Sequence, residues 1–258
     1  MEYKIVAFDS ITNNEYTVKY LNEDDYYKIM NDIRKLQISM LIKDYYFIVH
    51  ENINELLKYL PSVIPRDEYT FATLNRYTYN VLGVFYAWIE YCERNYNTIF
   101  SSIKSNYYDG FFEYRMMYNL RRFMTHCEMA VTEISINYKT NEMSINIEPR
   151  KLLEYKSGLQ KSFVPEIEQM VADNKNIELS ELMVGFGEVF NNIHRELMRG
   201  IEVEIKPIYE RIIGNIPFQE GKGQLCNIEE KETSKLVFPL TSFMGCIFRP
   251  DKAACTRK

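Results

Sequence analysis

The sequence predicts an α+β protein that is mainly helical, and three observations support this fold class. Apolar residues recur at helical spacing over several long segments, and short alternating segments occur near the start and in the middle of the chain. Hydrophobic residues make up 46% and charged residues 26% of the 258 residues, as is ordinary for a globular protein. The chain is therefore long enough to bury a sizeable core, in one large domain or two smaller ones.

Residues 1–65 are expected to form an N-terminal α/β subdomain. Alternating residues at 3–8 and 15–20 predict a hairpin, because turn-forming residues lie between them. The other elements expected here are a helix, a strand and a short second helix, over residues 24–40, 45–50 and 52–60. Pro61 and Pro65 interrupt the pattern and mark the end of this subdomain.

Residues 66–214 are expected to form a helical domain, and residues 215–258 an irregular C-terminal tail. The first part of the helical domain is expected to contain a helix over residues 66–97 capped by Asp67, a polar connection over 98–110 and a central helix over 111–130. A β-hairpin over 134–147 follows. The last expected elements are a helix over 151–174 broken at Pro165, a helix over 180–199 capped by Ser180 and a helix over 202–213. Gly200 separates the last two helices, and Gly185 and Gly187 are expected to allow close packing.

The central helix carries two neighbouring sets of side chains. The apolar set forms one seam: Phe112, Met116, Leu120, Phe123 and Cys127. The polar set has the same spacing: Arg115, Asn119, Arg122 and His126. On an ideal helix the polar set lies roughly a quarter turn from the apolar seam and therefore borders the core. A cationic strip in that position is suited to binding a phosphate.

Charge and cysteine content exclude several function classes. Lys and Arg total 31 against 36 Asp and Glu, so a net charge of −5 argues against general coating of nucleic acid. Residues 113–126 nevertheless hold three Arg and one Glu, a local excess of two positive charges. The five Cys show no zinc or redox spacing. We expect a cytoplasmic protein with reduced thiols, because no signal peptide or membrane-spanning run is evident.

The segment Leu-Arg-Arg-Phe-Met-Thr-His at residues 120–126 resembles the motif of the HEPN family, an Arg followed by four to six residues and a His. The resemblance covers about residues 68–200 and implies a compact HEPN-like helical bundle. Arg121 takes the place of the motif Arg and His126 that of the motif His. The residue after the Arg is usually small and polar, often Asn, whereas this chain has Arg122.

The resemblance implies a metal-independent endoribonuclease of a bacterial toxin or anti-phage defence system. Such proteins act on RNA as homodimers, without a cofactor, and a cognate antitoxin or defence-system protein is a further expected partner. His suits proton transfer from the 2′-hydroxyl, and Arg offers donors that match phosphate oxygens. The supporting residues expected around Arg121 and His126 are Arg122, Asn119, Arg115, Asn80 and Glu90.

Three alternatives remain open from the sequence. His126 and the Arg residues could be structural, with the Arg side chains paired to Glu113, Glu128 or Glu133. The chain could be a catalytically inactive HEPN-like module that binds a protein or nucleotide partner. It could also be modified by a nucleotidyltransferase, with Tyr114 and Tyr118 as acceptors. Arg121 and His126 lie about 140° apart on an ideal helix, so a shared site needs a helix end near His126 or a second subunit.

Overall fold

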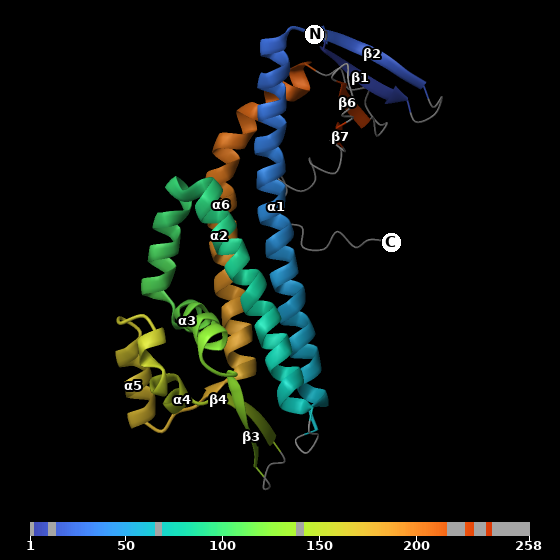
Figure 1. Cartoon of the computed structure of the whole chain (residues 1–258). Helices are drawn as coiled ribbons and strands as arrows, with labels where there is room; N and C mark the ends of the chain where they lie inside the picture. The colour runs from blue at the N-terminus through green and yellow to red at the C-terminus, as the bar shows by residue number, and fades with distance from the viewer. Residues whose placement is uncertain are drawn as a thin grey trace. The chain divides into compact units, whose positions relative to one another are not determined.

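The computed structural model describes residues 3–9, 14–64, 69–137, 142–215, 225–229 and 236–238, and within them the chain is mainly helical with small antiparallel sheets (Figure 1). The long helices are α1 (Glu23–Tyr59), α2 (Thr70–Gly110), α3 (Phe112–His126) and α6 (Leu179–Asn215). The short helices are η1 (Leu60–Ser62), α4 (Pro149–Glu154), η2 (Lys156–Gly158) and α5 (Val164–Ala172). The strands are β1 (Tyr3–Asp9), β2 (Asn14–Leu21), β3 (Val131–Asn137), β4 (Glu142–Ile147), β5 (Ile177–Glu178), β6 (Leu225–Glu229) and β7 (Leu236–Phe238).

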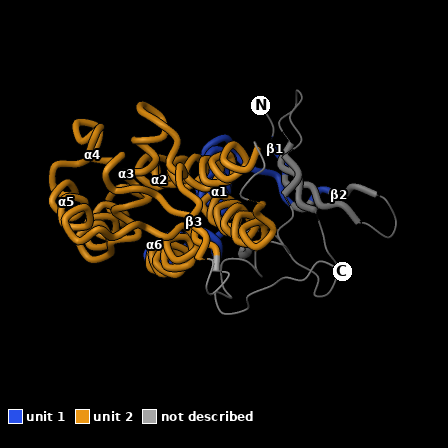
Figure 2. Tube along the Cα trace, turned by 90° about the horizontal axis from the view of Figure 1, so that it is seen from below, with its two compact units in different colours: residues 1–41, 198–258 blue, residues 42–197 orange. Residues whose placement is uncertain are grey.

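The chain divides into two compact units, residues 1–41 with 198–258 and residues 42–197 (Figure 2). The dividing points fall within α1 and α6, so each of these helices contributes to both units. The boundary expected at residue 65 therefore lies inside the second unit rather than between the two.

The first unit contains a four-stranded antiparallel sheet in the order β2-β1-β6-β7. The hairpin expected from residues 3–8 and 15–20 is confirmed as β1 and β2. The expectation of a wholly irregular tail over 215–258 is wrong, because α6 continues to Asn215 and β6 pairs with β1. Tail residues 216–224, 230–235 and 239–258 lie outside the described part of the chain.

Helix α1 runs without interruption through residues 45–50, where a strand was expected. Its buried residues recur at helical spacing across that segment: Ile42, Val49, Ile53 and Leu56. The aromatic and β-branched residues of this stretch suit either a strand or a helix. Tertiary packing selects the helix, since Tyr46 packs against Phe190 of α6 and Tyr45 lies beside Tyr91 of α2.

Helix α2 is longer than expected, because residues 98–110 are helical rather than a polar connection. Phe100 and Ile103 are buried, so this segment has its own apolar face. Tyr96 interrupts the helix with non-helical φ and ψ angles of −137° and 36°. The chain bends there, and the last turns of α2 lead back to α3 (Figure 1).

An aromatic core joins α2 and α6 in the second unit. The Trp88 ring packs edge to face on Phe100 and Phe190, and Phe85 does the same with Phe186. All five side chains are fully buried. Each buries a large apolar area, and edge-to-face pairs add to that stabilisation. This core fixes the α2 surface against which α3 packs.

The segment after α3 follows the sequence expectation only in part. Helix α3 ends at His126, earlier than the expected end at residue 130, whereas the hairpin expected at 134–147 is confirmed as β3 and β4. The single broken helix expected over 151–174 is instead α4, η2 and α5. Helix α6 continues through Gly200 and Pro207, so the separation expected at Gly200 is wrong.

Two helix caps were expected from the sequence, and Asp67, one of them, lies outside the described residues. Ser180 lies within α6, and the backbone N–H of Glu181 donates to the Glu178 carboxylate at 2.9 Å. A carboxylate at this end of a helix is favoured by the helix dipole. Within the described part of the chain, no helix combines the length and apolar character needed to cross a bilayer.

Candidate functional site

The polar strip of α3 borders the core as expected, but its members have different roles. Asn119 is fully buried, the Arg115 side chain is 14% exposed, Arg122 is half-buried and His126 is exposed. The strip therefore changes from buried to open along the helix, and the C-terminal turn of α3 holds its accessible part.

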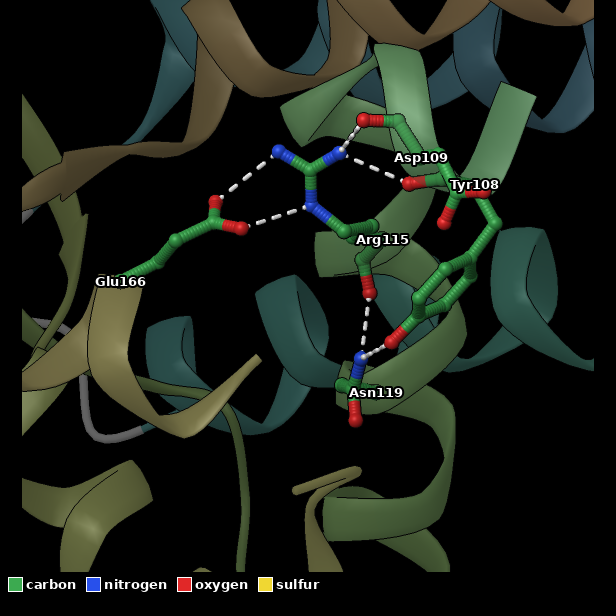
Figure 3. Close-up of polar contacts among 5 residues, drawn as sticks. All are labelled: Tyr108, Asp109, Arg115, Asn119 and Glu166. Atoms are coloured by element: carbon green, nitrogen blue, oxygen red, sulfur yellow. Dashed lines mark hydrogen bonds and ion pairs between the residues drawn. The ribbon is translucent and has the colours of Figure 1, made fainter. Parts of the chain in front are cut away.

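Arg115 joins three segments of the second unit (Figure 3). Its Nη1 donates to the backbone carbonyls of Tyr108 and Asp109 at 2.7 and 2.9 Å, at the end of α2. Its Nη2 donates to Glu166 of α5 at 3.0 Å. Its Nε lies 2.9 Å from the other Glu166 oxygen, within ion-pair distance but outside hydrogen-bond alignment. With four acceptors already around it, Arg115 is not free to bind a substrate phosphate, contrary to the sequence expectation.

Asn119 is likewise used by the fold. Its Nδ2 donates to the Arg115 carbonyl at 2.8 Å and to the Tyr108 hydroxyl at 3.3 Å (Figure 3). Its Oδ1 accepts the backbone N–H of Gln160 at 2.7 Å. Since the amide is buried and satisfied on both sides, Asn119 positions the segment before α5 and is not a substrate ligand.

Arg121 lies on the side of α3 that faces α2. Its guanidinium carbon is 3.9 Å from the centre of the Tyr86 ring, a close cation–π contact. The Arg121 guanidinium makes no hydrogen bond or ion pair with any residue that the structure describes. Its N–H donors are therefore unused by the described fold, although its position is fixed by the tyrosine ring.

His126 is the last residue of α3 and is exposed. Among the described residues, its imidazole has no hydrogen-bond, ion-pair or ring partner. Helix α3 remains regular from Arg121 to His126, so the two side chains leave the helix about 140° apart. The end of the helix does not bring them together within one chain, which leaves a second subunit as the way to a shared site.

Asn80 and Glu90, the expected supporting residues of α2, are both exposed. Among the described residues, no hydrogen bond or ion pair joins either of them to Arg121 or His126. The role of Asn80 and Glu90 in a site remains a prediction. Arg122 is half-buried and has no polar partner among the described residues.

The two candidate acceptor tyrosines differ in access. Tyr114 is fully buried, and burial raises the pKa of its hydroxyl. It cannot accept a nucleotidyl group unless α3 moves away from the core. Tyr118 is half-buried, with the Lys104 ammonium 5.4 Å from its ring centre. Only Tyr118 keeps any access in the described structure.

A chain of tyrosine contacts that the sequence did not indicate starts at Tyr86, the ring beneath Arg121, and continues to Tyr118, Tyr108 and Lys104. The rings of Tyr86 and Tyr118 lie 6.3 Å apart, and those of Tyr108 and Tyr118 lie 5.9 Å apart. Lys104 forms an ion pair with Glu93 at 2.5 Å. No sequence spacing relates Tyr86 of α2 to Arg121 of α3, because the contact depends on how the two helices cross.

Two other features are separate from the α3 residues. A cavity of about 390 Å³ lies between the hairpin and α5, lined by Glu133, Glu148, Arg150 and Lys175 among others. Both carboxylates already accept side-chain hydrogen bonds there. Among the described residues, no group of three or more His, Cys, Asp and Glu side chains is placed to hold a metal ion.

A buried His194 lies in the second unit and is used by packing. Its ring stacks on Tyr46 at 3.8 Å, and Tyr46 donates a hydrogen bond to Asn191 at 2.9 Å. Burial lowers the pKa of His194 to about 3, and the nearby charges of Lys43 and His50 act in the same direction. This imidazole is therefore neutral at physiological pH.

Comparisons with protein-family models, with curated proteins and with solved structures found no match to this chain.

Proposed function

We propose that this protein is a metal-independent endoribonuclease of a toxin or anti-phage defence system, acting as a homodimer. One observation carries the proposal: Arg121, Arg122 and His126 lie within the last turns of α3, and their side chains form no hydrogen bond or ion pair with the described residues. The other polar residues of the strip, Arg115 and Asn119, are used structurally. The resemblance to the HEPN motif concerns the same three residues.

In the proposed reaction, His126 takes the proton from a ribose 2′-hydroxyl. The 2′-oxygen then attacks the adjacent phosphorus, the bond to the 5′-oxygen breaks, and the leaving oxygen takes a proton from solvent water. Arg121 and Arg122 stabilise the charge that builds on the phosphate oxygens. The products are a 2′,3′-cyclic phosphate and a 5′-hydroxyl. Because the Arg121 and His126 side chains leave one helix in different directions, we place the Arg121 and the His126 of each active site on two different subunits.

The test is cleavage of a mixed pool of cellular RNA by the purified full-length chain with a chelator present. We expect fragments that end in 2′,3′-cyclic phosphate. His126→Ala should reduce the cleavage rate by 10²-fold or more, in line with the loss of a positioned acid–base group. Thr125→Ala is the matched control, since Thr125 is the exposed neighbour and its hydroxyl bonds only the Arg121 carbonyl of its own helix.

The proposal is overturned if the wild-type chain leaves every RNA in the pool intact, or if His126→Ala cleaves at the wild-type rate. Arg121→Gln should also lower the rate. The thermal unfolding of each variant separates a catalytic loss from a loss of fold.

A second candidate function is a catalytically inactive HEPN-like module that binds a protein or nucleotide partner. The observation that favours it is the placement of Arg121 over Tyr86, away from His126, together with the acidic net charge. A chain that cleaves no RNA yet binds a nucleotide or one defined protein would support this function instead.

A further inference from the structure

Helix α2 has one face that no described residue covers. The exposed residues of this face recur at helical spacing: Ala72, Arg76, Tyr79, Asn80, Gly83, Glu90 and Arg94. They precede the kink at Tyr96 and so share one regular segment, about 33 Å long for 22 steps of 1.5 Å. Tyr79 is 50% exposed, which leaves a large aromatic body on the surface.

Two of the three charged residues on this face lie symmetrically about Gly83, whereas Arg94 has the uncharged Ala72 at the corresponding position. Arg76 lies seven residues before Gly83 and Glu90 lies seven residues after it, which is close to two helical turns on either side. Neither side chain forms an ion pair with a described residue. The Arg76 guanidinium lies over the neighbouring Tyr77 ring, 4.8 Å from its centre.

Gly83 is not required by the fold of its own chain. A Cβ atom built on it meets no atom within 4 Å, and its helical conformation is open to any residue. A glycine inside a helix costs about 1 kcal/mol relative to alanine. What glycine does permit is a close approach by another backbone. Its position at the centre of the charge pattern therefore points to a crossing helix.

We propose that this face of α2 binds the same face of a second copy of the chain, in an antiparallel pair related by a twofold axis at Gly83. A twofold contact must be self-complementary, with residues before the axis meeting residues after it. Arg76 then meets Glu90 of the second copy, and the contact occurs twice. Tyr79 meets the smaller Ala87 of the second copy, so a large side chain faces a small one at each end.

The proposal names a contact surface and does not rest on ribonuclease activity. If the chain dimerises through α2 and cleaves no RNA, this inference stands and the proposed function is wrong. If the chain cleaves RNA but dimerises through another surface, the proposed function stands and this inference is wrong.

The test is the mass of the full chain in solution, measured by sedimentation equilibrium from about 1 to 100 µM at low salt. We expect a concentration-dependent dimer. Arg76→Glu places two like-charged pairs at the contact and should raise the dissociation constant at least tenfold. Glu90→Arg should do the same. The double variant Arg76→Glu/Glu90→Arg restores opposite charges and should recover dimerisation.

Gly83→Leu provides an independent check. Leucine is the better helix former, so the monomer should melt no lower than the wild type. The added side chain occupies the crossing point and should abolish the dimer. A wild-type chain that stays monomeric at 100 µM overturns the proposal. So does a dimer that the charge reversals leave unchanged, or a double variant that remains as weak as the single ones.

Discussion

The side chain of Asn75 forms two hydrogen bonds with the backbone of Val131, the first residue of β3. Asn75 Nδ2 donates to the Val131 carbonyl at 2.8 Å, and the Val131 N–H donates to Asn75 Oδ1 at 2.9 Å. The buried side-chain amide forms the pair of hydrogen bonds that the backbone of a neighbouring strand would otherwise form with Val131. It thereby fixes where the chain goes immediately after the His126 end of α3, so a residue of α2 positions the region proposed to be functional.

Asn75→Ala is expected to lower the free energy of unfolding by about 3 kcal/mol, because both Val131 backbone groups lose a buried partner. Urea denaturation followed by circular dichroism measures the change. Asn106→Ala is the control, since Asn106 is exposed on the same helix. Its effect should stay within about 0.5 kcal/mol. Equal effects at the two positions would contradict a special role for Asn75.

Arg115→Lys should destabilise the protein by about 2 kcal/mol. A lysine ammonium is a single point donor and cannot serve two carbonyls and both oxygens of Glu166 at once. Chemical denaturation gives the value, with the exposed Arg195→Lys as control. The rate of RNA cleavage per folded molecule should not change. A loss of RNA cleavage with unchanged stability would show that Arg115 binds the substrate after all.

Gly187→Ala and Gly185→Ala should differ, although both glycines lie in the interior of α6. A Cβ at Gly187 meets no atom within 4 Å, so alanine should raise stability by about 0.5–1 kcal/mol through helix propensity. A Cβ at Gly185 comes 3.0 Å from Glu113 Cγ, which must shift. The stability gain at Gly185 should therefore be smaller or absent, and the two melting temperatures report the difference.

Stability should fall with acidity because of His194. Its folded-state pKa of about 3 is below the usual 6.5, so the unfolded chain binds the proton more readily. The stabilising contribution is complete above pH 6.5 and is lost as the pH falls toward 3. The expected slope is about 1.4 kcal/mol per pH unit within that window. His194→Phe should flatten the denaturation profile over this range.

In the ion pair between Arg211 and Asp32 of the first unit, replacing each partner by alanine should lower the stability by a different amount. Arg211 donates to both Asp32 oxygens at 2.7 and 2.9 Å, and the Asp32 side chain is 4% exposed against 40% for Arg211. Arg211→Ala leaves a buried carboxylate without its cation, whereas Asp32→Ala leaves a guanidinium that water can reach. We expect Arg211→Ala to cost at least 1 kcal/mol more in thermal or urea unfolding. The opposite order would show that Asp32 finds another partner.

Local patterns in the sequence predicted the elements whose partners are close in the chain. The middle of the α3 seam and both hairpins were correct, because their periodicity or turn chemistry is contained in a few neighbouring residues. The same patterns could not decide residues 45–50. Their aromatic and β-branched side chains suit strand and helix alike, and the contact between Tyr46 and Phe190 of α6 decides the matter.

The same distinction between local sequence patterns and tertiary contacts applies to the candidate site. The sequence predicted a polar strip beside the α3 core, which is confirmed. The role of Arg121, Arg122 and His126 in a site remains a prediction. Only the tertiary structure assigned Arg115 to Glu166, Asn119 to Gln160 and Arg121 to Tyr86. A helical period fixes the angle at which a side chain leaves its own helix. It carries no information on what the neighbouring helix presents there, because that depends on how the helices cross and where α2 bends.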